Sequence, residues 1–153
     1  MLVLLFSVAI IILDQATKQW VMMRFYLGES LPVLPEWFNL VYVRNTGAAW
    51  GMLGGLNGLL VGLSLLVLII LIFFRRSFLT DCLVHRLALA LMIGGIVGNL
   101  LDRVRHQYVV DFLDFCWQSH HFPAFNVADF AICVGVGLYM MSALFPSKKN
   151  LQG

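Results

Sequence analysis

Two aspartates, Asp111 and Asp129, are of a type and in a setting that could carry hydrolytic chemistry in this sequence. Asp111 follows the β-branched pair Val109-Val110, and Asp129 lies near the start of a long apolar segment. The chain between the two aspartates can double back, so both carboxylates can meet in one site. Carboxylates that share a site cannot both ionise easily, so one pKa rises and the pair holds one proton. Such a pair supplies a base to activate water and an acid to protonate the leaving group, which peptide hydrolysis requires.

Spacing alone leaves two rivals for membership of such a pair, Asp102 and Asp114. Asn99 precedes Asp102 and Arg103 at helical spacing, so these three residues can share one face of a helix end. A carboxylate is unfavourable beside the C-terminus of a helix dipole. We therefore expect Asp102 to have a positive or hydrogen-bonding partner, such as Arg103 or the segment that caps the helix. A polar knot that fixes the helix end is favoured for this group over direct catalysis.

Capping is a second interpretation for the residues around Asp129. Asn126 is a good N-cap, and Asp129 then occupies the third helical position, from which a carboxylate can return to the cap. The positive end of the helix dipole also favours an anion there. From this segment alone capping is the favoured role, and it is compatible with membership of a carboxylate pair.

Asp14 and Lys18 form a further polar group inside the first apolar segment. An ionisable residue at the centre of a membrane span costs about 2.5–3.5 kcal/mol on insertion scales. Their spacing places both side chains on one helix face, within reach of a salt bridge. We expect a structural pair that faces the helix bundle rather than a catalytic couple.

Other catalytic and metal-binding patterns are missing from the sequence. The cysteines Cys82, Cys116 and Cys133 have spacings that match no metal or redox motif. His120 and His121 are adjacent, so they do not face one site on a helix, and we expect an exposed or interfacial pair. The sequence contains no nucleophile elbow, His-Glu-x-x-His motif or glycine-rich phosphate loop. We therefore expect no metal ion and no cofactor.

Composition indicates a membrane protein with a single domain over residues 1–153. Apolar residues make up 61% of the chain and charged residues 12%, whereas ordinary soluble domains carry about 25% charged residues. The 10 basic and 8 acidic residues balance too closely to indicate nucleic-acid binding. The apolar start of the chain has neither a basic leader nor a small-residue cleavage site, so we expect a retained first helix.

Four segments are long and apolar enough to cross a bilayer as helices, which takes about 20 residues each. The predicted fold class is an all-α polytopic membrane protein with four transmembrane helices and a small extracytoplasmic β-cap. Aromatic and β-branched residues at 37–43 and 108–112 predict strands in that cap, and a further amphipathic piece at 47–53 is left unassigned. The predicted spans cover residues 2–23, 52–74, 83–101 and 126–145, and the predicted outer segments cover 24–51 and 102–125.

Basic residues in short segments predict the orientation of the chain. They gather in the link between the second and third spans and in the C-terminal tail. The positive-inside tendency then places this link and both termini in the cytoplasm, and the two longer connections near the outer face. The basic residues of the short segments are Arg75, Arg76, Arg86, Lys148 and Lys149.

Five motifs, in order along nearly the whole chain, resemble the bacterial lipoprotein signal peptidase family, also called signal peptidase II. Each motif is weak alone, but five in register are highly specific. They are Asp14-Gln15-x-x-Lys18, Arg44-Asn45-Thr46-Gly47-Ala48-Ala49-Trp50, Gly94-Gly95-x-x-Gly98-Asn99-x-x-Asp102-Arg103, Val109-Val110-Asp111-Phe112 and Phe125-Asn126-x-Ala128-Asp129.

The resemblance implies a metal-free aspartic protease of the inner membrane that removes the signal peptide from prolipoproteins. The family cleaves before a cysteine that carries diacylglycerol, and the cyclic peptide globomycin inhibits it. Its partners are diacylglyceryl prolipoproteins and membrane lipids, and we expect a monomer. The resemblance selects Asp111 and Asp129 as the catalytic pair. Around the pair and the substrate it places Asn45, Asn99, Asp102, Arg103 and Asn126, while Asp14 and Lys18 match positions that look structural.

Two other classes of protein are alternatives from the residues alone. A small proton-coupled exporter can bury an acid such as Asp14 in its first span, but it needs little chain outside the membrane. A noncatalytic scaffold that binds lipoproteins has no need of both Asp111 and Asp129. The many polar residues in the predicted outer segments favour the protease over the exporter.

Overall fold

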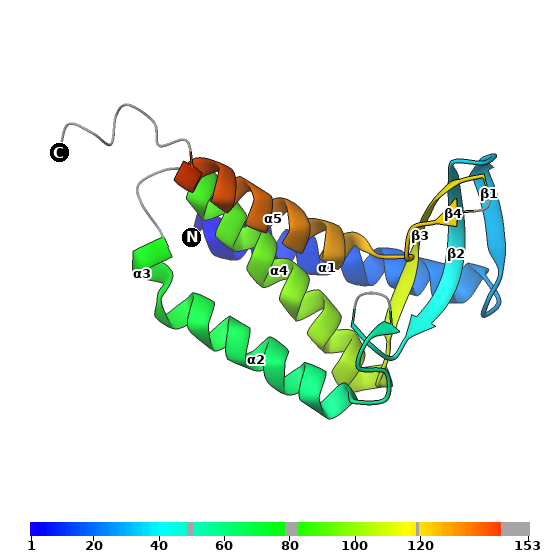
Figure 1. Cartoon of the computed structure of the whole chain (residues 1–153). Coiled ribbons are helices and arrows are strands. Elements are labelled where there is room, and N and C mark those ends of the chain that lie inside the picture. Colours follow the sequence, from blue (N-terminus) through cyan, green and yellow to red (C-terminus); the bar gives the residue numbers. More distant parts are fainter. Residues whose placement is uncertain (49–50, 79–82, 119, 145–153) are drawn as a thin grey trace.

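The computed structural model of the chain describes residues 1–48, 51–78, 83–118 and 120–144. Within these residues the helices lie together in a bundle, and a small sheet stands at one end of it (Figure 1). The helices are α1 (Leu2–Arg24), α2 (Asn57–Phe73), α3 (Arg75–Phe78), α4 (Leu83–His106) and α5 (Val127–Leu144). The strands are β1 (Ser30–Leu34), β2 (Phe38–Asn45), β3 (Val109–Trp117) and β4 (His120–His121).

Three helices of the described chain, α1, α4 and α5, are each long and apolar enough to cross a membrane, and α2 is a shorter apolar helix. Helix α2 begins at Asn57 rather than at residue 52, because the preceding chain turns through Gly51 and Gly55 at positive φ. Helix α4 continues to His106, past the predicted end of the third span at residue 101. The mostly helical character of the fold is therefore confirmed, with element bounds that differ by a few residues.

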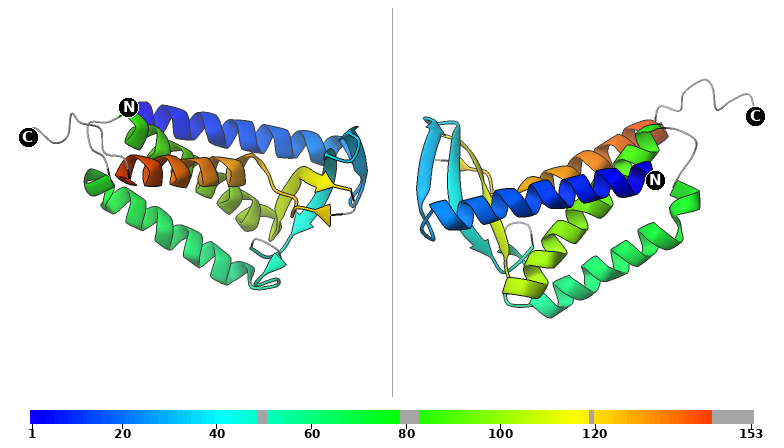
Figure 2. Two further views of the ribbon diagram at one scale, coloured as in Figure 1. Left: turned by 45° about the horizontal axis from the view of Figure 1, so that its top comes forward. Right: turned by 180° about the vertical axis from the view of Figure 1, so that it is seen from behind.

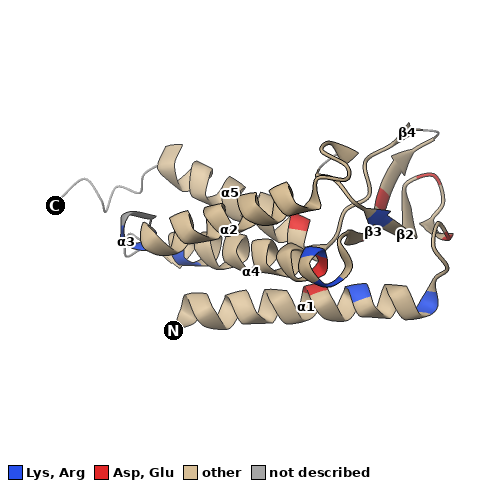
Figure 3. Cartoon of the chain, turned by 90° about the horizontal axis from the view of Figure 1, so that it is seen from below, with Lys and Arg blue, Asp and Glu red and all other residues tan. Residues whose placement is uncertain are grey.

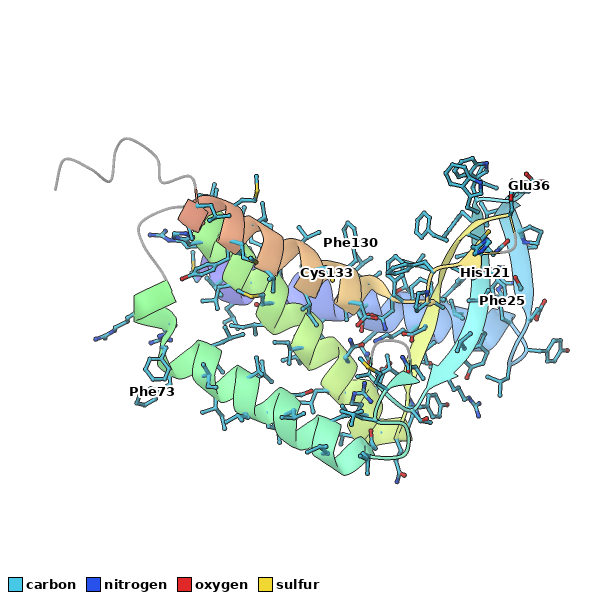
Figure 4. The ribbon with its side chains drawn as sticks, in the orientation of Figure 1. Phe25, Glu36, Phe73, His121, Phe130 and Cys133 are labelled. Carbon is cyan, nitrogen blue, oxygen red and sulfur yellow. The ribbon has the colours of Figure 1, made fainter. Side chains whose placement is uncertain are left out.

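Large apolar side chains cover the outside of the bundle. Phe73 of α2 is 80% exposed and Phe130 of α5 is 59% exposed, and both point away from their helices (Figure 4). Soluble monomers rarely expose apolar surface on this scale. The outer surface of the helices therefore suits lipid as its surroundings.

Helix α4 is packed tightly between α1 and α5 through its glycines. A Cβ atom on Gly94 would lie 2.8 Å from the Cβ of Ile10 in α1. A Cβ on Gly95 would collide with the carbonyl oxygen of Ala128 in α5. Because small residues let helix backbones approach closely, these glycines bring both α1 and α5 close to α4. Helix α2 diverges from this group of three helices (Figures 1 and 2).

The four strands form a sheet in the order β1-β2-β3-β4, with antiparallel neighbours. In the central pair, Val43 lies opposite Asp111 and Arg44 opposite Val110. The strands predicted at 37–43 and 108–112 are confirmed as β2 and β3, whereas β1 and the two-residue β4 were not predicted. The sheet lies across one end of the helices rather than beside them (Figure 2).

A buried apolar cluster fixes the sheet to the end of α1. Val21 of α1 packs with Tyr42 of β2 and with Val110 and Phe112 of β3, and all four side chains are at least 95% buried. Burial of such side chains contributes about 1.5–3 kcal/mol each. Because Asp111 lies between Val110 and Phe112, this cluster also fixes the position of Asp111 relative to the end of α1.

Some sequence features fall outside the described residues. These are Cys82 and the basic residues Lys148 and Lys149, together with residues 49–50 of the unassigned piece at 47–53 and the last residue of the predicted fourth span, 145. Among the described cysteines, Cys116 is partly buried and Cys133 is exposed, and both are free thiols.

Candidate active site

The N-terminus of α5 is built by the predicted reciprocal cap. The backbone N–H of Asp129 donates to Asn126 Oδ1 at 2.9 Å, and the backbone N–H of Asn126 donates to Asp129 Oδ2 at 3.2 Å. Both residues thus satisfy donors that the first turn of a helix would otherwise leave unpaired. The predicted capping role is confirmed, and it fixes the position of the Asp129 carboxylate at the sheet end of α5.

Asp111 is held by two side-chain amides from different parts of the chain. Asn126 Nδ2 donates to Asp111 Oδ1 at 2.7 Å, and Asn45 Nδ2 donates to Asp111 Oδ2 at 3.0 Å. The Asn45 side chain also accepts the backbone N–H of Gly47 at 2.9 Å. The end of β2 is therefore tied to the carboxylate of β3 through one asparagine.

Asn126 donates hydrogen bonds to both members of the predicted pair, Asp111 and Asp129. Its side chain donates to Asp111 and its backbone donates to Asp129. The second oxygen of Asp129 accepts from Asn99 Nδ2 of α4 at 2.7 Å. The structure therefore brings Asp111 and Asp129 to one asparagine, although they come from a strand and a helix with a loop between them.

Burial and charge together change the proton affinity of Asp111. The side chain is 2% exposed, and its pKa rises from 3.8 to about 7, first because burial disfavours the charged form and second because Asp129 carries like charge. Hydrogen bonds from Asn45 and Asn126 act in the opposite direction, since they favour the carboxylate. A carboxyl group with this pKa can hold a proton near neutral pH and release it within a reaction cycle.

Arg103 of α4 lies beside the two aspartates without a direct hydrogen bond to either among the described contacts. Its guanidinium interacts electrostatically with Asp111 and Asp129. One terminal nitrogen, Nη2, donates to the carbonyl oxygen of Gly47 at 2.8 Å, while the buried Nη1 has no hydrogen-bond partner within the described residues. Gly47 tolerates no side chain, because a Cβ there would lie 2.5 Å from the carbonyl oxygen of Met52. Arg103 therefore holds the chain after β2 close to the aspartates.

Asp102 belongs to a separate ion-paired group. Its carboxylate lies 3.0 Å from Lys18 Nζ, and it also accepts the backbone N–H of Val110 at 3.2 Å. The expected partner from the cap is thus present, but the cation that bonds Asp102 is Lys18 of α1 rather than Arg103. Helices α1 and α4 and strand β3 meet at this carboxylate. Its partners therefore come from α1 and β3 and not from Arg103, the next residue in the chain. The interpretation as a knot at the helix end fits these contacts.

The predicted contact between Asp14 and Lys18 is confirmed. The two side chains are 2.9 Å apart and at most 1% exposed, and Asp14 Oδ1 also accepts the backbone N–H of Ala128 in α5 at 3.0 Å. Asp14, on which the exporter alternative depended, is therefore enclosed by three helices.

Gln15 belongs to the same network and was not singled out as a site residue. Its Nε2 donates to Asp102 Oδ1 at 2.8 Å, and its Oε1 accepts from Arg105 at 3.1 Å. The signal in the sequence was a further polar residue beside Asp14 in an apolar segment.

The rival Asp114 lies apart from the two aspartates. It is three residues from Asp111 in a strand, where alternate side chains point to opposite faces. Its carboxylate accepts from Asn39 Nδ2 at 2.8 Å and lies 2.9 Å from His121 Nδ1. The expected exposure of His120 and His121 is confirmed, and Figure 4 shows His121 on the sheet.

Charged residues gather where the helices meet the sheet. In Figure 3 red and blue segments both appear on the helices near the sheet, and blue segments also appear at the other end of the bundle around α3. Among the described residues, no group of three or more His, Cys, Asp or Glu side chains has the geometry to hold a metal ion. The fold and this junction define a helical membrane protein with a pair of aspartates, one buried and one half-buried, at the foot of a small sheet.

Comparison with known proteins identifies the family. The sequence model described as Signal peptidase (SPase) II matches residues 6–145. The lipoprotein signal peptidase of Syntrophotalea carbinolica is 43% identical over 144 residues, covering 92% of this chain and 89% of that protein. The lipoprotein signal peptidase of Shewanella piezotolerans is 45% identical over 149 residues, covering 92% of this chain and 85% of that protein.

Solved structures agree with this assignment. A bacterial membrane enzyme determined by the in meso method at 2.3 Å matches with a TM-score of 0.89 and 32% identity, covering 99% of this chain and 92% of the other. A second such structure, at 1.9 Å, matches with a TM-score of 0.84 and 34% identity, covering 95% and 94%. The chain belongs to the signal peptidase II family of aspartic peptidases, and it is a multi-pass protein of the bacterial inner membrane.

Proposed function

We propose that this chain is an endopeptidase that removes the signal peptide from diacylglyceryl-modified prolipoproteins and cleaves before the lipidated cysteine. Asp111 and Asp129 are its catalytic pair. The proposal is supported by the names of the two relatives, both lipoprotein signal peptidases, and by the hydrogen-bonded aspartates at the junction of helices and sheet. Its partners are the prolipoprotein substrate and membrane lipids, and it works as a monomer without a metal ion or cofactor.

One observation carries the assignment of the pair, namely the asparagine that bonds both carboxylates. The Asn126 side chain donates to Asp111 at 2.7 Å while its backbone N–H donates to Asp129 at 3.2 Å. No described hydrogen bond links Asp102 or Asp114 to either of these aspartates. Two carboxylates held in this way, one buried and one half-buried, share one proton, as an aspartic peptidase requires.

The reaction follows from that shared proton. The ionised member of the pair takes a proton from water, and the water oxygen attacks the scissile carbonyl carbon. The protonated member donates its proton to the carbonyl oxygen, so a tetrahedral diol forms. When the carbon–nitrogen bond breaks, the protonated member of the pair gives its proton to the leaving amine nitrogen. The ionised member takes a proton from one diol hydroxyl, whose oxygen becomes the carbonyl oxygen of the new carboxyl group, so the pair again holds one proton.

The supporting residues have distinct roles in this proposal. Asn45, Asn99 and Asn126 orient the two carboxylates through the hydrogen bonds described above. Arg103 keeps the chain around Gly47 in place and presents Nη1, a buried donor without a partner among the described residues, to the substrate backbone. Asp102 supports the helix end.

The orientation in the membrane follows the distribution of charge. Helices α1, α2, α4 and α5 cross the bilayer, both termini lie in the cytoplasm, and the sheet forms a cap on the outer face. Arg75 and Arg76 of α3 lie at the end of the bundle far from the sheet (Figure 1), which supports this orientation by the positive-inside tendency. The aspartates then lie near the outer water layer, where a lipid-anchored substrate can reach them sideways from the bilayer.

The test is a cleavage assay with purified protein. A prolipoprotein with diacylglycerol on its cysteine is incubated beside the same prolipoprotein without lipid, and we expect cleavage of the lipidated form alone. Globomycin is expected to inhibit it. Equal cleavage of both substrates would contradict the proposed specificity, and cleavage of neither would contradict the proposed function.

Point variants test the catalytic pair. Asp111→Asn and Asp129→Asn are each expected to lower the rate about 10³-fold or more, because each removes an acid–base group from the reaction. Asp114→Asn is the matched control, since Asp114 is a buried carboxylate of the same strand. Retained cleavage by either folded variant of the pair would remove that aspartate from the mechanism.

A further inference from the structure

Lys18 makes more contacts than the expected pair with Asp14. Its side chain is 1% exposed, and Nζ lies 2.9 Å from Asp14, 3.0 Å from Asp102 and 2.9 Å from Asn99 Oδ1. An ammonium group has three donors and no acceptor. The three oxygens therefore match its full capacity, and one of them belongs to a residue that bonds an aspartate of the catalytic pair.

The Asn99 side chain lies between Lys18 and Asp129. Its Oδ1 accepts from Lys18 and from Asn126 Nδ2, the latter at 3.2 Å, and its Nδ2 donates to Asp129 Oδ1 at 2.7 Å. An ammonium cannot accept a hydrogen bond, so only the carbonyl end of the amide can face Lys18. The amide NH2 group must then face Asp129. A flipped amide would place two oxygen atoms against each other at the carboxylate.

We propose that Lys18 is a positioning residue for the peptidase reaction, because its ammonium holds the Asn99 amide in the orientation that donates to Asp129. This inference rests on the proposed function, since it concerns the same aspartate pair. It assigns Lys18 a role that a salt bridge between α1 and α4 would not require. In this role Lys18 acts on the reacting carboxylate through Asn99 and does not touch the substrate.

The charge of Lys18 has a second consequence for the pair. Its positive charge lowers the pKa of Asp111 and so opposes the effect of burial. Loss of that charge therefore moves the pKa of Asp111 upward, and the active protonation state of the pair moves to higher pH. The charged groups that face this region are Asp14 of α1, Asp102 and Arg103 of α4, Asp111 of β3 and Asp129 of α5.

Lys18→Met in the full-length protein tests the proposal with a lipidated prolipoprotein as substrate. We expect kcat to fall about 10- to 100-fold, the effect of losing a hydrogen bond to a charged group, while KM changes less than about threefold. We also expect the optimum of the pH–rate profile to shift to higher pH. An unchanged kcat and an unchanged profile in a folded variant would overturn the inference.

Ser7→Ala is a matched structural control. Ser7 is buried in the same α1–α4 interface, and its Oγ donates to the carbonyl oxygen of Ala90 at 3.0 Å, far along the chain from the aspartates. We expect a lower melting temperature with an unchanged pH–rate profile. If Ser7→Ala moved the profile as Lys18→Met does, Lys18 would be a structural residue only.

A double-mutant cycle separates action through Asn99 from independent effects. If Lys18 acts through Asn99, Lys18→Met should lower kcat little further in an Asn99→Ala background, whereas full additivity of the two effects would overturn the inference. Should Lys18→Met fail to fold, Lys18→Met with Asp14→Asn leaves less unpaired negative charge and serves in its place. Cleavage by the wild-type protein tests the proposed function separately, because it depends on neither variant.

Discussion

Two groups of carboxylates lie within one junction of helices and sheet, and they are held in different ways. Asp14 and Asp102 each contact the ammonium of Lys18, at 2.9 and 3.0 Å. Asp111 and Asp129 receive hydrogen bonds from neutral amides of Asn45, Asn99 and Asn126. We call the first the ion-paired group and the second the amide-held pair.

The difference teaches how one fold separates structure from chemistry. A buried carboxylate beside an ammonium has a fixed charge partner, so its contacts join elements. A carboxylate held by amides alone keeps its geometry while its proton remains exchangeable, and the pKa of Asp111 at about 7 suits that use. Asn99 connects the two groups, since one end of its amide faces Lys18 and the other faces Asp129.

The largest effect on stability is expected in the ion-paired group. One oxygen of Asp14 bonds Lys18 and the other accepts the Ala128 N–H. Asp14→Asn replaces one of these oxygens with an NH2 group and removes the negative charge. Breaking one side of a buried ion pair costs about 3–5 kcal/mol, because the remaining charge stays buried. Thermal unfolding in detergent would measure this loss in the free energy of unfolding. If Asp14→Asn lowered the free energy of unfolding no more than Ser7→Ala does, the ion-paired group would not have the structural role given to it here.

In the amide-held pair, replacing an aspartate by asparagine should raise the free energy of unfolding instead of lowering it. The pKa of Asp111 is raised from 3.8 to about 7, so the folded protein keeps a proton there that the unfolded chain has lost between these pH values. The free energy of unfolding therefore falls as pH rises from about 4 to about 7, by about 4 kcal/mol at most. Asp111→Asn does not titrate, and we expect it to exceed the wild type in stability at pH 8.

Unfolding at pH 4 and pH 8 checks this prediction. Asp111→Asn and wild type should be nearly equal at pH 4 and differ at pH 8, with Asp114→Asn showing no such gain. Destabilisation of Asp111→Asn at pH 8 would mean that Asp111 is held as a structural carboxylate, like those of the ion-paired group.

The asparagine between the two aspartates should have an intermediate effect. Asn126→Ala removes the 2.7 Å bond to Asp111 and the side-chain cap of α5. We expect cleavage to fall about 10- to 100-fold from the lost bond to a charged group, and stability to fall by about 1 kcal/mol from the lost cap. Steady-state kinetics with unfolding curves separate the two effects. A loss of stability with unchanged kcat would leave Asn126 as a cap alone.

The smallest effect is expected for the carboxylate outside both groups. Asp114 contacts Asn39 and the exposed His121 on the sheet. Asp114→Asn should change kcat less than about threefold, because the remaining amide can still bond these neighbours and the aspartate pair is untouched. Initial rates at matched protein concentration would measure it. A loss comparable to that of Asn126→Ala would extend the site to the far face of β3.

Several features of the molecule follow from local spacing and were predicted from the sequence. Asp14 and Lys18 meet because helical geometry brings residues at this spacing to one face. Asn126 and Asp129 cap α5 because their spacing matches the first turn of a helix. The strands β2 and β3 follow from runs of aromatic and β-branched residues that suit a half-buried sheet. Strand β1 gave no such signal, because it is only five residues long and Pro32 lies in its middle.

Tertiary structure alone decided which distant residues meet. Nothing in the spacing of Lys18 and Asp102, or of Asn126 and Asp111, predicts their contacts, because each pair joins elements whose separation depends on helix packing at glycines such as Gly95. The residues left Asp102, Asp111 and Asp114 as equal candidates beside Asp129, and the family resemblance chose among them. The folded chain gives each of the three its own partners, because a carboxylate in a dry junction must find donors wherever the packed elements bring them.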